Sequence, residues 1–287
     1  MTIKKGKNET STNGFKFNPS ELKPKLRSEM EQLVRPFVIP LIVDGDRNGT
    51  GTLVYFDKTY GILTAQHVAS LILKGKRLAT LAESYSNSLE IDTAYLTEIL
   101  ALKPKGKDAG PDLAFLAIPP GPFRSQLIAR KSFMNGELDW TNKYREASKL
   151  GWGVVIFSGY PASLRFEAAG DRHFESVSGL KHMFAHCSGE KLCEKDGYDY
   201  LDLNVDYKVD PRSPTTFGGA SGGSVWRILV ERELGQPVGT ETIRGSCLAG
   251  VAFCESDRAN DSRTIRCHGP KSLYKEFFPQ IVKKLRH

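Results

Sequence analysis

A histidine, an aspartate and a serine in this chain have the order and surroundings that nucleophilic acyl transfer requires. The histidine lies in the segment Leu-Thr-Ala-Gln-His67-Val, the aspartate opens Asp112-Leu-Ala-Phe-Leu, and the serine lies in Gly-Gly-Ala-Ser221-Gly-Gly. This chemistry needs a hydroxyl, a base that takes its proton, and a carboxylate that orients the base and stabilises its cation. We therefore predict that His67, Asp112 and Ser221 are catalytic.

Short runs of β-forming residues, separated by Gly, Pro and Asp, surround these three residues. Such runs occupy much of residues 37–118 and again of residues 153–267. Many short strands at this spacing are typical of all-β barrels or sandwiches and not of βαβ units. The stretch near residues 120–152 is rich in Pro, Gly, Lys and Arg with little strand pattern, and we expect a domain border there.

Helices are expected at both ends of the folded part. Residues 20–35 begin with a serine cap, carry Pro24 near their start and place apolar residues on one face. Residues 272–285 have an apolar residue at every fourth position, which predicts an amphipathic C-terminal helix. Residues 1–19 are polar and basic, and we interpret them as a flexible arm.

The three segments resemble the trypsin-like (chymotrypsin-fold) serine peptidases, and more closely their disulfide-free bacterial members. The first is similar to the family's Thr-Ala-x-His, the second to its Asp-Ile-Ala-Leu-Leu, and Gly219-Ala-Ser221-Gly-Gly to Gly-Asp/Asn-Ser-Gly-Gly. The match covers roughly residues 36–285. It implies two antiparallel six-stranded β-barrels, the first (residues 36–135) carrying His67 and Asp112, the second (residues 136–287) carrying Ser221 and the C-terminal helix.

The resemblance also assigns roles. Ser221 is expected to be the nucleophile, His67 the general base and then acid, and Asp112 the orienting carboxylate, while the amides of Gly219 and Ser221 form the oxyanion hole. Ala220 departs from the family pattern, because digestive members have an acidic residue there that pairs with a newly cut N-terminus. Activation by that switch is therefore not expected.

Substrate preference is left open by the sequence. The resemblance places Thr215 at the base of the substrate pocket, where an aspartate would favour cleavage after Lys or Arg. Phe253, Glu255 and His268 fall on or near strands that would wall this pocket. Glu255 could favour a basic side chain and His268 an acidic one, while ordinary surface or core roles are the alternative for both.

Metal and cofactor chemistry is not expected. Four residues with ligand chemistry cluster within 12 positions, but their spacing matches no common zinc finger and an ordinary polar loop is the better interpretation; they are His182, His186, Cys187 and Cys193. Basic runs such as residues 74–77 and 103–107 lack interleaved aromatics, so nucleic acid is an unlikely partner and solvated surface is favoured.

Composition bounds the remaining possibilities. The chain has 287 residues, 25% of them charged, and a net charge of +7 that is concentrated in the first 27 residues. No signal peptide and no apolar stretch of about 18 residues is present, so we expect no membrane association and a cytoplasmic protein. Five cysteines in a chain of this length favour free thiols.

We therefore expect a serine endopeptidase that needs no cofactor and acts on a protein or peptide substrate through an acyl-enzyme. Narrow specificity or regulation, for example by a protein partner, is expected because an unrestrained protease in the cytosol would be hazardous. The alternative hypothesis is a catalytically silent module of the same fold that binds a peptide or partner protein in the cleft between the barrels by strand addition.

Overall fold

A computed structural model describes most of the chain. The described residues are 24–45, 47–81, 88–103, 111–138, 153–168, 177–180, 182–187, 189–206, 214, 216–231, 240–256 and 262–287. The expected flexible arm, residues 1–19, lies outside them. No helix within the described part is long and apolar enough to cross a membrane.

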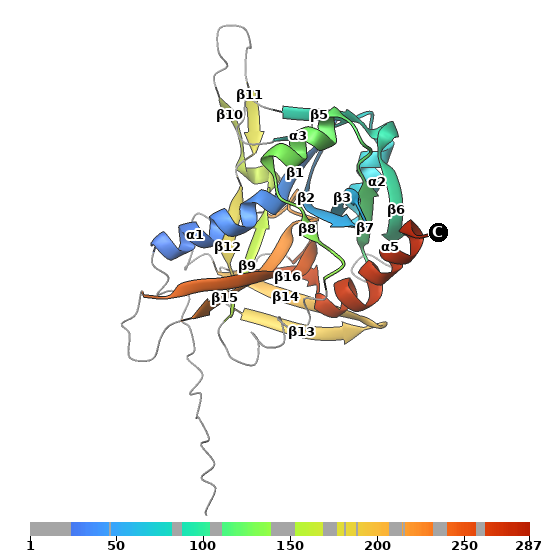
Figure 1. Cartoon of the computed structure of the whole chain (residues 1–287). Coiled ribbons are helices and arrows are strands. Elements are labelled where there is room, and N and C mark those ends of the chain that lie inside the picture. The colour runs from blue at the N-terminus through green and yellow to red at the C-terminus, as the bar shows by residue number, and fades with distance from the viewer. Residues whose placement is uncertain are drawn as a thin grey trace, which may run out of the picture.

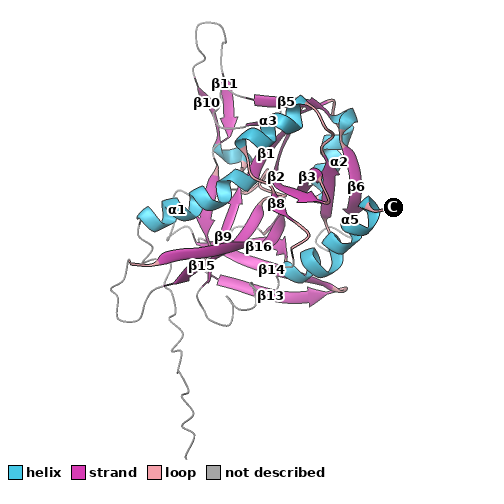
Figure 2. Ribbon diagram, viewed as in Figure 1, coloured by secondary structure: helices cyan, strands magenta, loops and turns pink. Residues whose placement is uncertain are grey.

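The protein is mostly β, as expected, with two large sheets (Figures 1 and 2). The first sheet has eight strands in the order β5-β4-β1-β2-β3-β7-β6, with β8 beside β2, and only the β2–β8 pair is parallel. Its strands are β1 (Val38–Val43), β2 (Arg47–Phe56), β3 (Thr59–Thr64), β4 (Arg77–Leu81), β5 (Ser88–Asp92), β6 (Thr97–Leu102), β7 (Leu113–Ala117) and β8 (Met134–Asn135).

The second sheet has seven antiparallel strands in the order β12-β9-β15-β16-β17-β14-β13. Its strands are β9 (Gly153–Gly159), β12 (Met183–His186), β13 (Gly189–Lys195), β14 (Tyr198–Asp206), β15 (Ser224–Glu231), β16 (Thr242–Glu255) and β17 (Ser262–His268). A separate hairpin pairs β10 (Arg165–Ala168) with β11 (Val177–Leu180).

The strand numbers correct the expectation of six strands in each half. One cause is local turn chemistry that adds hairpin partners. Asp196 and Gly197 both have positive φ, +53° and +85°, and they close a two-residue loop between β13 and β14. Asp-Gly is a preferred pair for such tight hairpins. The other cause is β8, a two-residue segment that lies parallel to β2.

Three apolar clusters hold these sheets. One lies mainly among strands of the first sheet, with Ile39, Leu53 and Leu116, and also includes Tyr200 and Phe253 of the second sheet. Another lies among strands of the second sheet and includes Phe157 and Val225. The third contains residues from both sheets and from the helices at either end of the chain; its members include Met30, Phe56, Phe115, Ile156, Trp226, Leu248, Phe277 and Ile281. The two sheets therefore share a common buried core in addition to their own.

Helices lie around the margins of the sheets (Figure 2). The expected N-terminal helix is α1 (Pro24–Val34), which packs on β16, and α2 (Gln66–Lys74) follows β3. The region expected to be a domain border holds an unexpected helix, α3 (Pro122–Arg130), which starts at a proline as helices commonly do.

The expected C-terminal helix is present but irregular. It consists of a π-helical segment, Ser272–Phe277, followed by α5 (Phe278–Leu285), which contacts β6. Pro279 has no amide to donate and its ring crowds the carbonyl four residues earlier. We attribute the wider turn before it to this proline.

Candidate functional site

The structure brings His67 and Asp112 together through the register of two strands. Thr64 in β3 pairs with Ala114 in β7, so the end of β3 and the start of β7 lie side by side. His67 follows β3 as the second residue of α2, and Asp112 immediately precedes β7. The two side chains, 45 positions apart in sequence, therefore meet beside the adjacent ends of β3 and β7 in the first sheet.

Both oxygens of the Asp112 carboxylate bind His67. Oδ1 accepts the backbone amide of His67 at 3.0 Å, and Oδ2 lies 2.6 Å from Nδ1 of its ring. A carboxylate can only accept, so Nδ1 carries the proton and Nε2 is left with a lone pair. The Asp112 side chain is 7% exposed and that of His67 is 43% exposed. The arrangement thus holds the imidazole of His67 in a fixed orientation while leaving part of the ring exposed.

His268 supports Asp112 from behind. Its Nε2 accepts the backbone amide of Asp112 at 2.9 Å, and its ring is fully buried and stacked on Phe253, with ring centroids 4.6 Å apart. Burial lowers the pKa of His268 to about 3, so the ring is neutral at pH 7. A neutral ring is what the contact needs, because a protonated Nε2 could not accept a hydrogen bond.

Ser221 is the second residue of the latter of two successive tight turns, which share Ala220. Ala220 donates its amide to the Phe217 carbonyl, and Gly223 donates to the Ala220 carbonyl, both at 2.8 Å. The third residues of these turns, Gly219 and Gly222, have φ of +83° and +85°, which glycine adopts without strain. Among the described residues, no protein acceptor binds the amides of Gly219 and Ser221. Both amides are available to an incoming oxygen.

Gly222 is also required by its surroundings. A Cβ atom there would collide with the carbonyl oxygen of Thr50 and with Oγ1 of Thr64. The amide of Gly222 donates to the Ala252 carbonyl at 2.7 Å, which fastens the turn to β16. The loop is therefore packed closely between the two sheets.

Thr50 joins the Ser221 loop to the first sheet, and the sequence did not single it out as a site residue. Its amide donates to the Ser221 carbonyl at 2.9 Å, and its Oγ1 donates to the Gly219 carbonyl at 3.1 Å. The same Oγ1 accepts the amide of Tyr160 at 3.0 Å, and Thr64 Oγ1 donates to the Thr50 carbonyl at 2.7 Å. One buried threonine of β2 thereby fixes the carbonyls on both sides of Ala220.

The Ser221 hydroxyl has a partner other than the imidazole. Its Oγ donates to the carbonyl of Phe253 at 3.4 Å, a long hydrogen bond. Among the described residues no hydrogen bond joins Ser221 to His67. Attack by Ser221 as a nucleophile would require its hydroxyl to exchange the Phe253 carbonyl for Nε2 of His67.

Comparisons with known proteins were made for the whole chain. The sequence matches no protein-family model and none of the curated proteins searched. Similar solved structures include the serine endoprotease from Yersinia pestis, with 15% identity over 91% of this chain and 68% of that chain at a TM-score of 0.43. They also include the HtrA-type protease AlgW with a tripeptide, with 14% identity over 90% of this chain and 64% of that chain, again at 0.43.

A third similar structure comes from work on the Sesbania mosaic virus VPg protein, with 13% identity over 83% of this chain and 88% of that chain at a TM-score of 0.40. This chain spans about two thirds of the length of the two proteases. Likenesses at these identities and scores transfer no activity, so the chemistry rests on the geometry described above.

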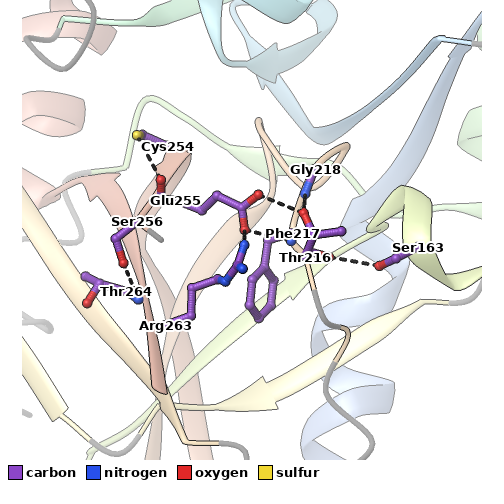
Figure 3. A network of polar contacts seen from close by, with 9 residues as sticks. All are labelled: Ser163, Thr216, Phe217, Gly218, Cys254, Glu255, Ser256, Arg263 and Thr264. Carbon is purple, nitrogen blue, oxygen red and sulfur yellow. Dashed lines mark hydrogen bonds and ion pairs between the residues drawn. The ribbon is translucent and has the colours of Figure 1, made fainter. Parts of the chain in front are cut away.

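The residues expected to line a substrate pocket have varied surroundings. Thr215 lies outside the described residues. Phe253 is 7% exposed and packs on the buried His268. The carboxylate of Glu255 is bound by Thr216, by the amide of Phe217 and by Arg263 (Figure 3). Both carboxylate oxygens of Glu255 therefore bind donors of the protein, in contrast to the expectation that this side chain faces a substrate.

The residues considered for metal binding are dispersed or engaged. His182 uses both ring nitrogens, with Nε2 2.8 Å from Ser158 Oγ and Nδ1 3.2 Å from Glu31 Oε1. Burial is the main cause that lowers the pKa of His182. Cys187 is buried and Cys193 lies on β13, while the side chain of His186 is not described. Within the described part of the chain, no group of three or more His, Cys, Asp or Glu could hold a metal ion.

Proposed function

We propose that this protein is a serine endopeptidase in which Ser221 is the nucleophile, His67 the base and Asp112 the orienting carboxylate. The observation that carries the proposal is the bidentate contact between Asp112 and His67, which leaves Nε2 able to accept a proton. The unengaged amides of Gly219 and Ser221 support it, since they can serve as an oxyanion hole.

The proposed reaction follows from these positions. Nε2 of His67 takes the proton from Ser221 Oγ as the oxygen attacks the peptide carbonyl carbon, and Asp112 stabilises the resulting imidazolium. The amides of Gly219 and Ser221 bind the carbonyl oxygen as it becomes negative. His67 then protonates the leaving amine, and water hydrolyses the acyl-enzyme by the same path.

A fluorophosphonate probe tests this assignment directly. The wild-type protein should be labelled at Ser221 and should cleave members of a defined peptide library, whereas Ser221→Ala should do neither. Ser125→Ala removes an exposed hydroxyl from α3 and should behave as wild type. Absence of both labelling and cleavage in the folded wild-type protein would remove the proposal.

A second candidate function is a silent binding module of the same architecture. It is favoured by one observation, the hydrogen bond from Ser221 to Phe253 in place of one to His67. In that case wild type and Ser221→Ala would capture the same peptide equally, and neither would release a product.

We also propose that the two sheets close as separate barrels, residues 36–135 and residues 136–287. An apolar cluster confined to the second half of the chain, with Phe157 and Val225 among its members, supports this division. All five cysteines are thiols with no disulfide between them, which fits a reducing compartment, and we propose a cytoplasmic location on that ground. A regulatory protein partner remains a prediction.

A further inference from the structure

The carboxylate of Glu255 collects three hydrogen bonds beside the turn that presents Gly219 (Figure 3). Thr216 Oγ1 donates to Oε1 at 2.9 Å, and the amide of Phe217 donates to Oε2 at 2.8 Å. Arg263 Nη1 reaches the same Oε2 at 2.6 Å. Both oxygens of Glu255 therefore bind donors of the protein.

Two of these donors belong to the segment that leads into the turn. Thr216 Oγ1 also accepts the amide of Gly218 at 3.2 Å, and the Phe217 carbonyl accepts the amide of Ala220 at 2.8 Å. The backbone of residues 216–218 is thereby fixed at several atoms. The amide of Gly219 follows directly from this segment, so its direction depends on the contacts of Glu255.

The peptide groups on both sides of the Gly219 Cα atom are fixed by further contacts. The carbonyl of Gly218, in the same peptide group as the Gly219 amide, accepts the amide of Ala162 at 2.7 Å. The carbonyl of Gly219 accepts Thr50 Oγ1 at 3.1 Å. The amide of Gly219 thus lies between two anchors, Glu255 acting through residues 216–218 and Thr50 acting on the following carbonyl. An amide held on both sides is preorganised to meet a developing charge.

The anchor is an ionised carboxylate. Its side chain is 26% exposed and that of Arg263 is 15% exposed. Burial works to raise the pKa of Glu255, but the hydrogen bonds from Phe217, Arg263 and Thr216 outweigh it and hold this pKa below its ordinary value. A glutamine of the same shape would place an NH₂ group against one of these donors.

We infer that Glu255 is a positioning residue that orients the Gly219 amide for the oxyanion of the acyl-transfer reaction. Its carboxylate therefore acts on the segment before Ser221 and not on a substrate side chain. The inference rests on the proposed peptidase function and adds a residue to its machinery.

Kinetics of Glu255→Gln test the inference. The variant should lose ~10–100-fold in kcat, with KM within about twofold of wild type, because an oxyanion contact strengthens only in the transition state. The matched control is Glu231→Gln, which breaks the Glu231–Arg244 ion pair elsewhere on β15 and β16 of the same sheet and should leave kcat unchanged.

A binding measurement distinguishes positioning from substrate recognition. In the Ser221→Ala background, Glu255→Gln should bind the best-cleaved library peptide with unchanged affinity, while in the active background it should slow the fluorophosphonate reaction by the same factor as kcat. Weaker peptide binding with unchanged reactivity would overturn the inference and assign Glu255 to recognition.

Failure of the two proposals can be separated. If the wild type neither labels nor cleaves, the peptidase proposal fails; if the wild type is active and Glu255→Gln matches Glu231→Gln, only the positioning role fails. Should Glu255→Gln not fold, Thr216→Val decides, because it removes the hydroxyl that links Glu255 to Gly218 while preserving shape. A folded Thr216→Val with wild-type kcat would refute the inference.

Discussion

The backbone amide of Asp112 donates to Nε2 of His268 across 156 positions of sequence, at 2.9 Å. Asp112 is thus held at two places, its carboxylate by His67 and its main-chain amide by a buried neutral imidazole. The main chain of the first sheet at Asp112 is thereby tied to β17 of the second. Acid groups that orient a base are effective only when their own position is fixed.

Replacing His268 by phenylalanine should preserve stacking on Phe253 but remove the acceptor for the Asp112 amide. A buried donor without a partner costs about 1–3 kcal/mol, so stability to urea should fall by that amount. Peptidase kcat should fall about tenfold, or about 1.4 kcal/mol in barrier height. Tyr198→Phe, which keeps the ring beside His268, is the control. Unchanged stability and kcat in His268→Phe would contradict this role.

The buried His268 also predicts a dependence of stability on pH. The pKa of His268 is about 3 in the folded protein against an ordinary value of 6.5 in the unfolded chain, so between these values the unfolded chain binds more protons than the folded one. Its contribution to stability is therefore complete above pH 6.5 and is lost progressively as the pH falls toward 3. Urea titrations should show that the free energy of unfolding falls less steeply between about pH 7 and about pH 4 in His268→Phe than in the wild type. Parallel curves would contradict this.

Thr50→Val should show what the Thr50 hydroxyl contributes to stability and activity, because the substitution leaves the main-chain hydrogen bonds of the residue in place. The variant loses the Oγ1 contacts to Gly219 and Tyr160, which should cost about 1–3 kcal/mol of stability and about tenfold in kcat. Thr52→Val on the same strand is a matched control. Thr52 Oγ1 is buried with no hydrogen-bond partner among the described residues, so its removal should leave stability equal or higher. Equal losses in both variants would refute the special role of Thr50.

Gly222→Ala should lower the stability of the protein much more than the same substitution at Gly197, a comparable glycine. It combines positive φ with collisions against Thr50 and Thr64, whereas Gly197 has the same φ of +85° and open space around its Cα. Gly197→Ala should therefore cost only the backbone strain of about 1–2 kcal/mol. Unfolding midpoints in urea measure the difference, and equal costs would show that the Ser221 loop has room to move.

The contact between Glu31 and the buried His182 is expected to anchor α1 to the rest of the protein. Glu31→Ala leaves Nδ1 of the buried His182 without its carboxylate partner, which should cost about 1–3 kcal/mol and speed proteolysis within α1. Glu29→Ala on the same helix removes only an exposed pair with Lys25 and should cost about 0–0.5 kcal/mol. Equal protease sensitivity of the two variants would contradict the anchoring role of Glu31.

Local sequence patterns predicted the elements that short-range chemistry determines. Short runs of β-forming residues indicated the strands, and the segments around His67 and Asp112 indicated two side chains that the structure places in contact. Glycines around Ser221 are a local signal for tight turns, and in the structure Gly219 and Gly222 have positive φ. Helix α3 was missed because the Pro and Gly residues near its start were interpreted as a linker.

Long-range contacts were beyond the sequence. Thr50 is one of two threonines in its strand, and only the packed structure shows that it reaches a loop 169 positions away. His268 and Glu255 were considered as pocket residues because of their place after Ser221. Their partners in the structure are Asp112 and the residues before Gly219, and no local periodicity encodes those pairings.

The core shared by the two sheets includes Met30 of α1 and Ile281 of α5. Because this core joins residues that lie far apart in the sequence, it can form only when both helices have reached the two sheets, and contacts between such distant segments form slowly. Docking of the two helices is therefore expected to be a late step of folding, and it fixes the position of one sheet against the other.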